Sequence, residues 1–136
     1  MSTAPNSRAV KGLALTGAAL IVLVGVIHLV DAPDSFGEAA YKGALFAANG
    51  VAAAVAAVGV LRGSRWGWHL GVLVSAGAFL GYVVSRTLGL PGLPPDEWME
   101  PLGVASLIAE ALFVAVYLRA ISGARGAGSS PPAETT

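Results

Sequence analysis

Four long runs of apolar residues constrain the fold of this chain more than any other feature. They cover residues 12–30, 43–61, 66–86 and 101–118. Each is close to the roughly 20 residues that an α-helix needs to cross the hydrocarbon core of a bilayer. Only 12% of the 136 residues are charged, against about a quarter in soluble domains. The sequence therefore predicts an all-α integral membrane protein, a four-transmembrane-helix bundle embedded in the lipid bilayer.

The segments around these runs are short and polar. Residues 1–11 and 121–136 are expected to be disordered at the two ends of the chain. Residues 31–41 and 87–100 carry acids together with Pro and Gly, and they are expected to be loops on one side of the membrane. The first run could also be a signal peptide. It is longer than an h-region of about 7–15 residues and no A-x-A site follows it, which favours a membrane span.

The charged residues are sorted between the two sides of the predicted bundle. On one side lie Arg8, Lys11, Arg62, Arg65, Arg119 and Arg125. On the other side lie Asp31, Asp34, Glu38, Asp96, Glu97 and Glu100, with Lys42 and Arg86 as the only basic residues. By the positive-inside rule, both termini are expected in the cytoplasm. Together with the Ala, Gly and Val bias of a high-GC bacterial gene, this predicts a multi-pass protein of a bacterial plasma membrane.

Several classes of chemistry find no support in the sequence. No cysteine is present, which excludes disulfides, thiolate metal sites and dithiol chemistry. No nucleophile–base–acid set, phosphate loop or basic nucleic-acid patch occurs. His28 and Asp31 are spaced to offer two metal ligands, with Glu38 or Glu100 as a third, but no metal-motif pattern repeats, which favours a capping or interfacial His28. His28 and His69 lie near opposite faces, roughly 20 Å or more apart, and cannot share a haem. We therefore expect no enzymatic activity, cofactor, metal or nucleic-acid partner.

Polar residues inside the predicted spans gather on the acidic side. Glu110 lies nine residues into the fourth run, roughly 13 Å deep. Side chains tilt toward the N-terminus of their helix, so Arg86 should lean into the membrane and Glu110 should lean toward it. The candidate ligand-binding cluster is His28, Asn49, Tyr82, Arg86, Ser106 and Glu110.

This cluster has three interpretations. Ionised groups are costly inside a membrane and are rarely kept without a partner or a role. Arg86 and Glu110 could form a buried pair that fixes helix register. The cluster could instead line an outward-facing pocket for a small ligand, a lipid headgroup or an ion, with residues 87–100 as its lid and with protonation of Glu110. In the third interpretation, Glu110 faces another subunit.

Small residues recur every four positions along the third run. Gly77, Gly81 and Ser85 form a small-xxx-small face of the kind that lets helix backbones approach closely. The same spacing continues in Gly67, Gly71 and Ser75. Such a face is typical of packing within one bundle, and it also fits a homodimer or a membrane partner.

The segment SRTLGLPGLPPDEWMEPLGVASLIAEALF, residues 85–113, resembles a recurring stretch of small four-span actinobacterial membrane proteins. Those proteins also tend to carry a first-span His followed by an acid, as in His28 and Asp31. The resemblance implies a fold and a family but no activity. It marks Arg86, Pro91, Glu100 and Glu110 as positions to test.

The size and the four spans are also similar to those of small multidrug-resistance exporters, which are dimers around a membrane-buried Glu. That family has its Glu in the first span and an aromatic-rich chamber, and this chain has neither. The sequence thus favours a non-enzymatic membrane protein with a polar ligand pocket. The alternatives are a structural or accessory subunit of a membrane complex, and a small proton-coupled dimeric exporter.

Overall fold

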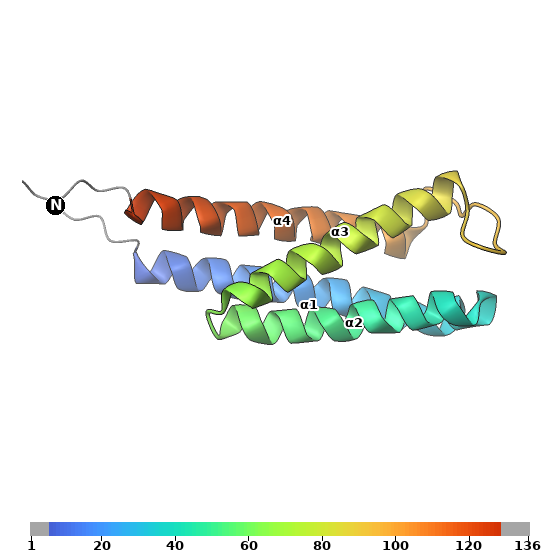
Figure 1. Ribbon diagram of the computed structural model, residues 1–136, viewed down its shortest axis with the longest axis horizontal. Helices are drawn as coiled ribbons and strands as arrows, with labels where there is room; N and C mark the ends of the chain where they lie inside the picture. Colours follow the sequence, from blue (N-terminus) through green and yellow to red (C-terminus); the bar gives the residue numbers. More distant parts are fainter. Residues whose placement is uncertain (1–5, 129–136) are drawn as a thin grey trace, which may run out of the picture.

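The computed structural model describes residues 6–128, which form four α-helices and no strand (Figure 1). These helices are α1 (Ser7–Glu38), α2 (Ala40–Leu61), α3 (Arg65–Thr87) and α4 (Pro101–Gly128). All four are long and apolar enough to cross a membrane. The predicted all-α, four-helix fold is confirmed, and the helices indicate a multi-pass membrane protein.

The first and last helices extend beyond the predicted spans. α1 begins at Ser7, because the side chain of Asn6 accepts a hydrogen bond from a backbone N–H in the first turn and caps the helix. α4 continues to Gly128. The terminal segments predicted to be disordered are therefore helical in their inner parts. Their outer parts, residues 1–5 and 129–136, lie outside the described residues.

The predicted acidic loop at residues 31–41 is largely helical. α1 runs through Pro33 to Glu38, and only Ala39 separates it from α2. Ala39 has an extended backbone (φ −158°, ψ 137°), and its N–H donates to the carbonyl of Ser35. With 32 residues, α1 is about 48 Å long. Its acidic end can therefore lie beyond the ~30 Å hydrocarbon core while it remains helical.

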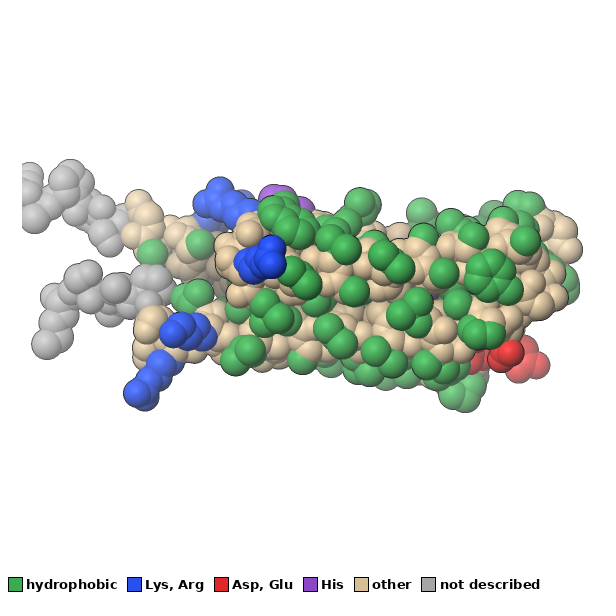
Figure 2. All heavy atoms as spheres, turned by 90° about the horizontal axis from the view of Figure 1, so that it is seen from below, with side chains coloured by type: hydrophobic (Ala, Val, Ile, Leu, Met, Phe, Trp, Pro, Cys, Tyr) green, Lys and Arg blue, Asp and Glu red, His purple; other side chains and the backbone are tan. Residues whose placement is uncertain are grey.

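The four helices form an antiparallel ring in which each packs against two neighbours. The most extensive seam joins α1 to α2, and the least extensive joins α3 to α4. In Figure 1, α3 runs obliquely to the other three helices. The α2–α3 turn, the start of α1 and the end of α4 lie at one end, here called the basic end. The α1–α2 junction and loop 88–100 lie at the other, here called the acidic end. In Figure 2, Lys and Arg side chains gather at one end of the visible face and Asp and Glu at the other.

The apolar core fills the middle of the bundle and the half nearer the basic end. Its buried members are Ile21, Val24, Ala53, Ala56, Ala57, Val74, Ala109 and Phe113. Small residues bring the helices together here. A Cβ on Gly67 would clash with the backbone of Gly59, and one on Gly71 would clash with the ring of Phe113. Close packing therefore fixes this half and leaves the acidic half to hold the polar residues.

Candidate functional site

A cavity of about 1020 Å³ lies between the helices in the half nearer the acidic end. Residues of all four helices and of loop 88–100 line it. All six residues of the predicted cluster are among them: His28, Asn49, Tyr82, Arg86, Ser106 and Glu110. The structure thus gathers the whole predicted cluster around one cavity. Their role in ligand binding stays a prediction.

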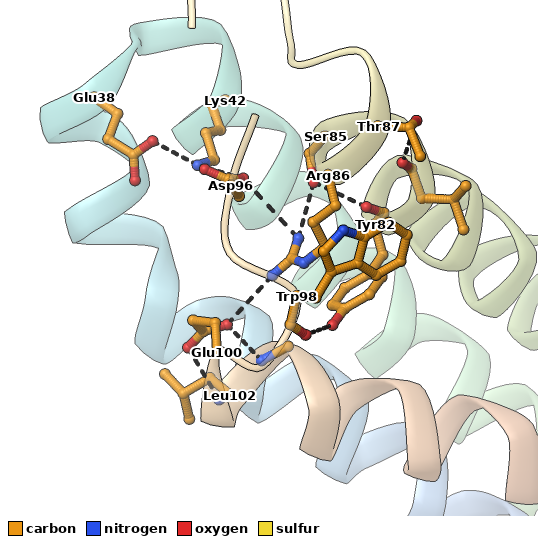
Figure 3. Close-up of polar contacts among 12 residues, drawn as sticks. Glu38, Lys42, Tyr82, Ser85, Arg86, Thr87, Asp96, Trp98, Glu100 and Leu102 are labelled. Carbon is orange, nitrogen blue, oxygen red and sulfur yellow. Dashed lines mark hydrogen bonds and ion pairs between the residues drawn. The ribbon is translucent and has the colours of Figure 1, made fainter. Parts of the chain in front are cut away.

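Arg86 lies near the mouth of this cavity and is held on several sides (Figure 3). Its guanidinium carbon lies 3.6 Å from the centroid of the Tyr82 ring, in a cation–π arrangement. Its terminal nitrogens lie 3.9 Å from a carboxylate oxygen of Asp96 and 3.7 Å from one of Glu100. One of them also donates to the Ser85 hydroxyl at 2.8 Å. Arg86 therefore joins the end of α3 to the loop and to the start of α4.

The predicted Arg86–Glu110 pair is not formed. Among the described residues, the ion pairs of Arg86 go to Asp96 and Glu100. The physical reason is position along the helices. Glu110 lies on α4 ten residues after Glu100, which precedes that helix, and this separates the two by roughly 15 Å along the axis. Arg86 lies at the level of Glu100. The acids of loop 88–100 are nearer and pair with the terminal nitrogens of the guanidinium, while its buried Nε has no hydrogen-bond partner among the described residues.

Loop 88–100 is tied to α3 and to α2 by hydrogen bonds. The Tyr82 hydroxyl donates to the carbonyl of Trp98, and the Tyr41 hydroxyl donates to the carbonyl of Pro91 at 2.7 Å. The backbone N–H of Asp96 donates to the carbonyl of Ser85 at 2.9 Å. The loop is thus fixed over one side of the cavity.

Lys42 is the second cation of the site. Its ammonium lies 2.6 Å from a carboxylate oxygen of Glu38 and 3.5 Å from one of Asp96. Asp96 therefore bridges Lys42 and Arg86 (Figure 3). Glu100 has a second task, because its two carboxylate oxygens accept the N–H groups of Leu102 and Gly103 and cap α4.

Glu110 lies deeper and is almost fully buried, with 4% of its surface exposed. The hydroxyl of Ser106, one turn earlier on α4, donates to its Oε1 at 2.6 Å. Its Oε2 is also buried and has no hydrogen-bond partner among the described residues. An unpartnered carboxylate oxygen is costly in a low-dielectric interior, so Glu110 offers the cavity a buried acceptor whose partner the described residues do not supply.

Asn49 and His28 complete the polar wall. The Asn49 side-chain amide donates to the carbonyl of Val74 at 3.3 Å, and its Oδ1 is buried without a partner. His28 Nδ1 lies 2.9 Å from the carbonyl of Val24. Since a carbonyl can only accept, Nδ1 carries a hydrogen, and Nε2 of a neutral ring is then an acceptor. Both residues offer an acceptor atom beyond their bonds within the protein.

The small residues of α3 pack against other helices in one part of the helix and face open space in another. Gly67 and Gly71 pack against neighbouring helices, as expected for packing within one bundle. At Gly77 and Gly81, an added Cβ would meet nothing within 4 Å, and both residues line the cavity. The expectation of intramolecular packing therefore fails at these two positions, because no side chain of the facing helices fills the space.

The cavity is rich in carboxyl groups. Its lining includes Asp31, Asp34, Glu38, Asp96, Glu97, Glu100 and Glu110, against Lys42 and Arg86. Both cations are already paired with carboxylates. The arrangement can therefore attract a positively charged ligand and offer it hydrogen-bond acceptors.

Sequence reasoning missed Lys42, Asp96 and Gly103 as parts of the site. The sequence could have indicated Lys42, because Lys42 and Arg86 are the only basic residues on the acidic side. Nothing in the sequence indicates that Gly103 belongs to the site. A Cβ on Gly103 would crowd the Arg86–Glu100 pair and the Tyr82 ring, a contact that appears only once the helices are placed.

No group of three His, Asp or Glu residues within the described range is arranged to hold a metal ion. Comparison of the chain with family models, with curated proteins and with solved structures finds no match.

Proposed function

We propose that this protein binds a small organic cation in the polar cavity of its transmembrane bundle. The observation that carries the proposal is Glu110, which lines the cavity, is 4% exposed and has a buried Oε2 without a partner. A cationic group beside this atom would supply the missing charge and, where it bears N–H, the missing donor. Glu110 would be the electrostatic centre, with Asn49 and His28 as further acceptors.

The balance of charge supports a cation over an anion. An anionic headgroup would need Lys42 or Arg86, and both are held by carboxylates of the protein. It would also approach the carboxyl groups of Asp31 and Asp34, for which no ion pair is formed among the described residues. Clefts lined by one sign of charge concentrate the opposite sign.

The ligand would enter at the acidic end. Asp34, Glu38 and Glu97 are exposed and line the cavity, so it reaches the surface there. With the basic end in the cytoplasm, as the positive-inside rule predicts, this mouth would face outward from the plasma membrane of a bacterium. The protein would act by binding, without a chemical step.

Equilibrium binding to nanodisc-embedded protein tests the proposal. The probes are benzyltrimethylammonium and an anion of similar size, benzenesulfonate. We expect saturable binding of the cation alone, weakened about tenfold or more in Glu110→Gln, which corresponds to loss of about 1.4 kcal/mol. Glu97→Gln, the same change at an exposed acid of the mouth, is the matched control and should bind nearly as the wild type. Lack of cation binding, or binding unchanged in Glu110→Gln, would overturn the proposal.

A second candidate is an accessory subunit whose partner helix packs on Gly77 and Gly81. The observation that favours it is the open space beside both glycines. In that case Gly81→Leu would break a complex while cation binding stayed absent in the wild type. No observation on the described residues favours the proton-coupled dimeric exporter over a binding pocket.

A further inference from the structure

A second hollow lies on the surface of the bundle between α3 and α4, with a volume of about 580 Å³. Its lining is apolar except for two residues: Ser75, Ala76, Phe79, Leu107, Ile108, Glu110, Ala111 and Val114. Phe79 is 56% exposed and Ile108 is 57% exposed. In a helix that crosses a membrane, such side chains face lipid chains, so this α3–α4 groove opens sideways into the bilayer.

The groove and the cavity share Glu110 and Leu107 in their linings. Glu110 therefore lies where the polar cavity meets the apolar groove. The α3–α4 seam in which they meet is the least extensive of the bundle. On the cavity side of the same seam, Gly77 and Gly81 leave open space beside α3. The volumes of both hollows are close to the roughly 300–1000 Å³ of ligand sites.

We infer that the ligand is an amphiphile with one cationic head and an alkyl chain. The head lies in the cavity against Glu110, and the chain lies in the α3–α4 groove among Phe79, Ile108 and Val114. This inference rests on the proposed cation site and names its ligand class. The inference follows from the position of Glu110. Its carboxyl group, with one buried and unpartnered oxygen, lies between the acidic cavity and the apolar α3–α4 groove. A molecule that satisfies both sides must carry positive charge at one end and hydrocarbon at the other.

Photo-cross-linking tests where the chain lies. The probe is dodecyltrimethylammonium with a diazirine at the end of the chain, added to the full chain in nanodiscs, and labelled peptides are mapped by mass spectrometry. We expect labelling concentrated on α3 and α4 around Phe79 and Ile108. With the probe well below its own dissociation constant, benzyltrimethylammonium at about ten times its dissociation constant should reduce this labelling about tenfold by mass action. Labelling of Leu23 and Val55, which are exposed and line neither hollow, should not respond.

Two substitutions separate the groove from the cation site. Ala111 is exposed and lines the groove but not the cavity, so Ala111→Trp should fill the groove and remove the competed labelling. Binding of benzyltrimethylammonium should persist in this variant, which also shows that it folds. Ala54→Trp, at an exposed position of α2 outside both hollows, is the matched control and should label as the wild type.

The outcomes distinguish the two proposals. If benzyltrimethylammonium binds but the chain labels all lipid-facing helices evenly and without competition, the amphiphile inference is wrong and the cation pocket stands. If Ala111→Trp leaves the competed labelling unchanged, the chain does not use this groove and the inference is also wrong. If benzyltrimethylammonium does not bind the wild type, the proposed function itself fails.

Discussion

The two halves of α3 carry the same small-residue spacing and behave differently. Toward the basic end, Gly67 lies against the backbone of α2 and Gly71 lies against Phe113 of α4. Toward the acidic end, Gly77 and Gly81 face open space and line the cavity. The same spacing is therefore compatible with close helix packing and with the wall of a cavity. The facing helix and its angle to α3 decide which of the two is formed (Figure 1).

The two halves of the bundle are held together by different interactions. The packed half holds the helices together through apolar contacts. The acidic half is held by Lys42 and Arg86, whose carboxylate partners tie loop 88–100 to the helix ends. Substitutions in the first half should therefore affect folding of the whole bundle, and substitutions in the second should mainly affect ligand binding and the attachment of loop 88–100.

The largest effect is expected from Gly67→Leu. The new side chain would collide with the backbone of Gly59, which cannot move aside as a flexible side chain can. We expect a loss of about 3 kcal/mol or more in the free energy of unfolding, at the upper end for overpacking. The matched control is Gly77→Leu on the same helix, which should change stability by about 0.5 kcal/mol or less. Unfolding in detergent mixtures, followed by circular dichroism, measures both. Equal losses would mean that the two halves are packed alike.

Arg86→Met should give the next largest effect. It keeps the length of the side chain but leaves Asp96 and Glu100 without their shared cation. The partner carboxylates are 31% and 39% exposed, and water therefore screens part of the interaction. We expect a loss of about 1 kcal/mol and faster proteolytic cleavage in loop 88–100. Arg65→Met at the basic end is the control. An intact, protected loop in Arg86→Met would show that the ion pairs do not hold it.

Tyr41→Phe should have a smaller effect of the same kind. It removes the hydrogen bond to the carbonyl of Pro91 and little else. A single exposed hydrogen bond is worth about 1 kcal/mol or less. Hydrogen exchange of loop 88–100 should increase locally, while exchange in the packed half stays as in the wild type. A global increase in exchange would contradict the separation of the two halves.

Glu110→Gln should have the smallest effect on stability. The Ser106 hydroxyl can still donate to the amide oxygen of the new side chain, and no ion pair is broken, because Glu110 forms none among the described residues. We expect the free energy of unfolding to stay within about 1 kcal/mol of the wild type or to rise. A loss of about 3 kcal/mol would instead be the result expected for a broken buried ion pair.

The fold was predictable because a bilayer permits few arrangements of long apolar runs. The gathering of the polar cluster around one cavity was predictable because the depth of each residue follows from helix geometry alone. The partners of Arg86 were not, since they depend on how loop 88–100 returns across the end of α3. The helix through Pro33 was not predictable either, because local composition favours a loop, while α1 continues in contact with α2.

The open face at Gly77 and Gly81 could not be read from the sequence for a related reason. The same glycine spacing occurs in the packed and in the hollow half, and the facing residues and the inclination of α3 distinguish the two. Likewise, the position of Glu110 between the cavity and the α3–α4 groove requires knowledge of both neighbouring helix faces.

The most direct test is the accessibility of introduced thiols to reagents. The chain suits this test because its sequence contains no cysteine. The measurement compares Gly81→Cys in the cavity wall with Ala57→Cys in the packed core, which is 4% exposed. The reagents are water-soluble methanethiosulfonates, one cationic and one anionic. The account predicts that only Gly81→Cys reacts, and faster with the cationic reagent, because carboxyl groups surround the path. Equal inertness of the two variants, or faster reaction of Gly81→Cys with the anion, would contradict a hollow, cation-selective acidic half.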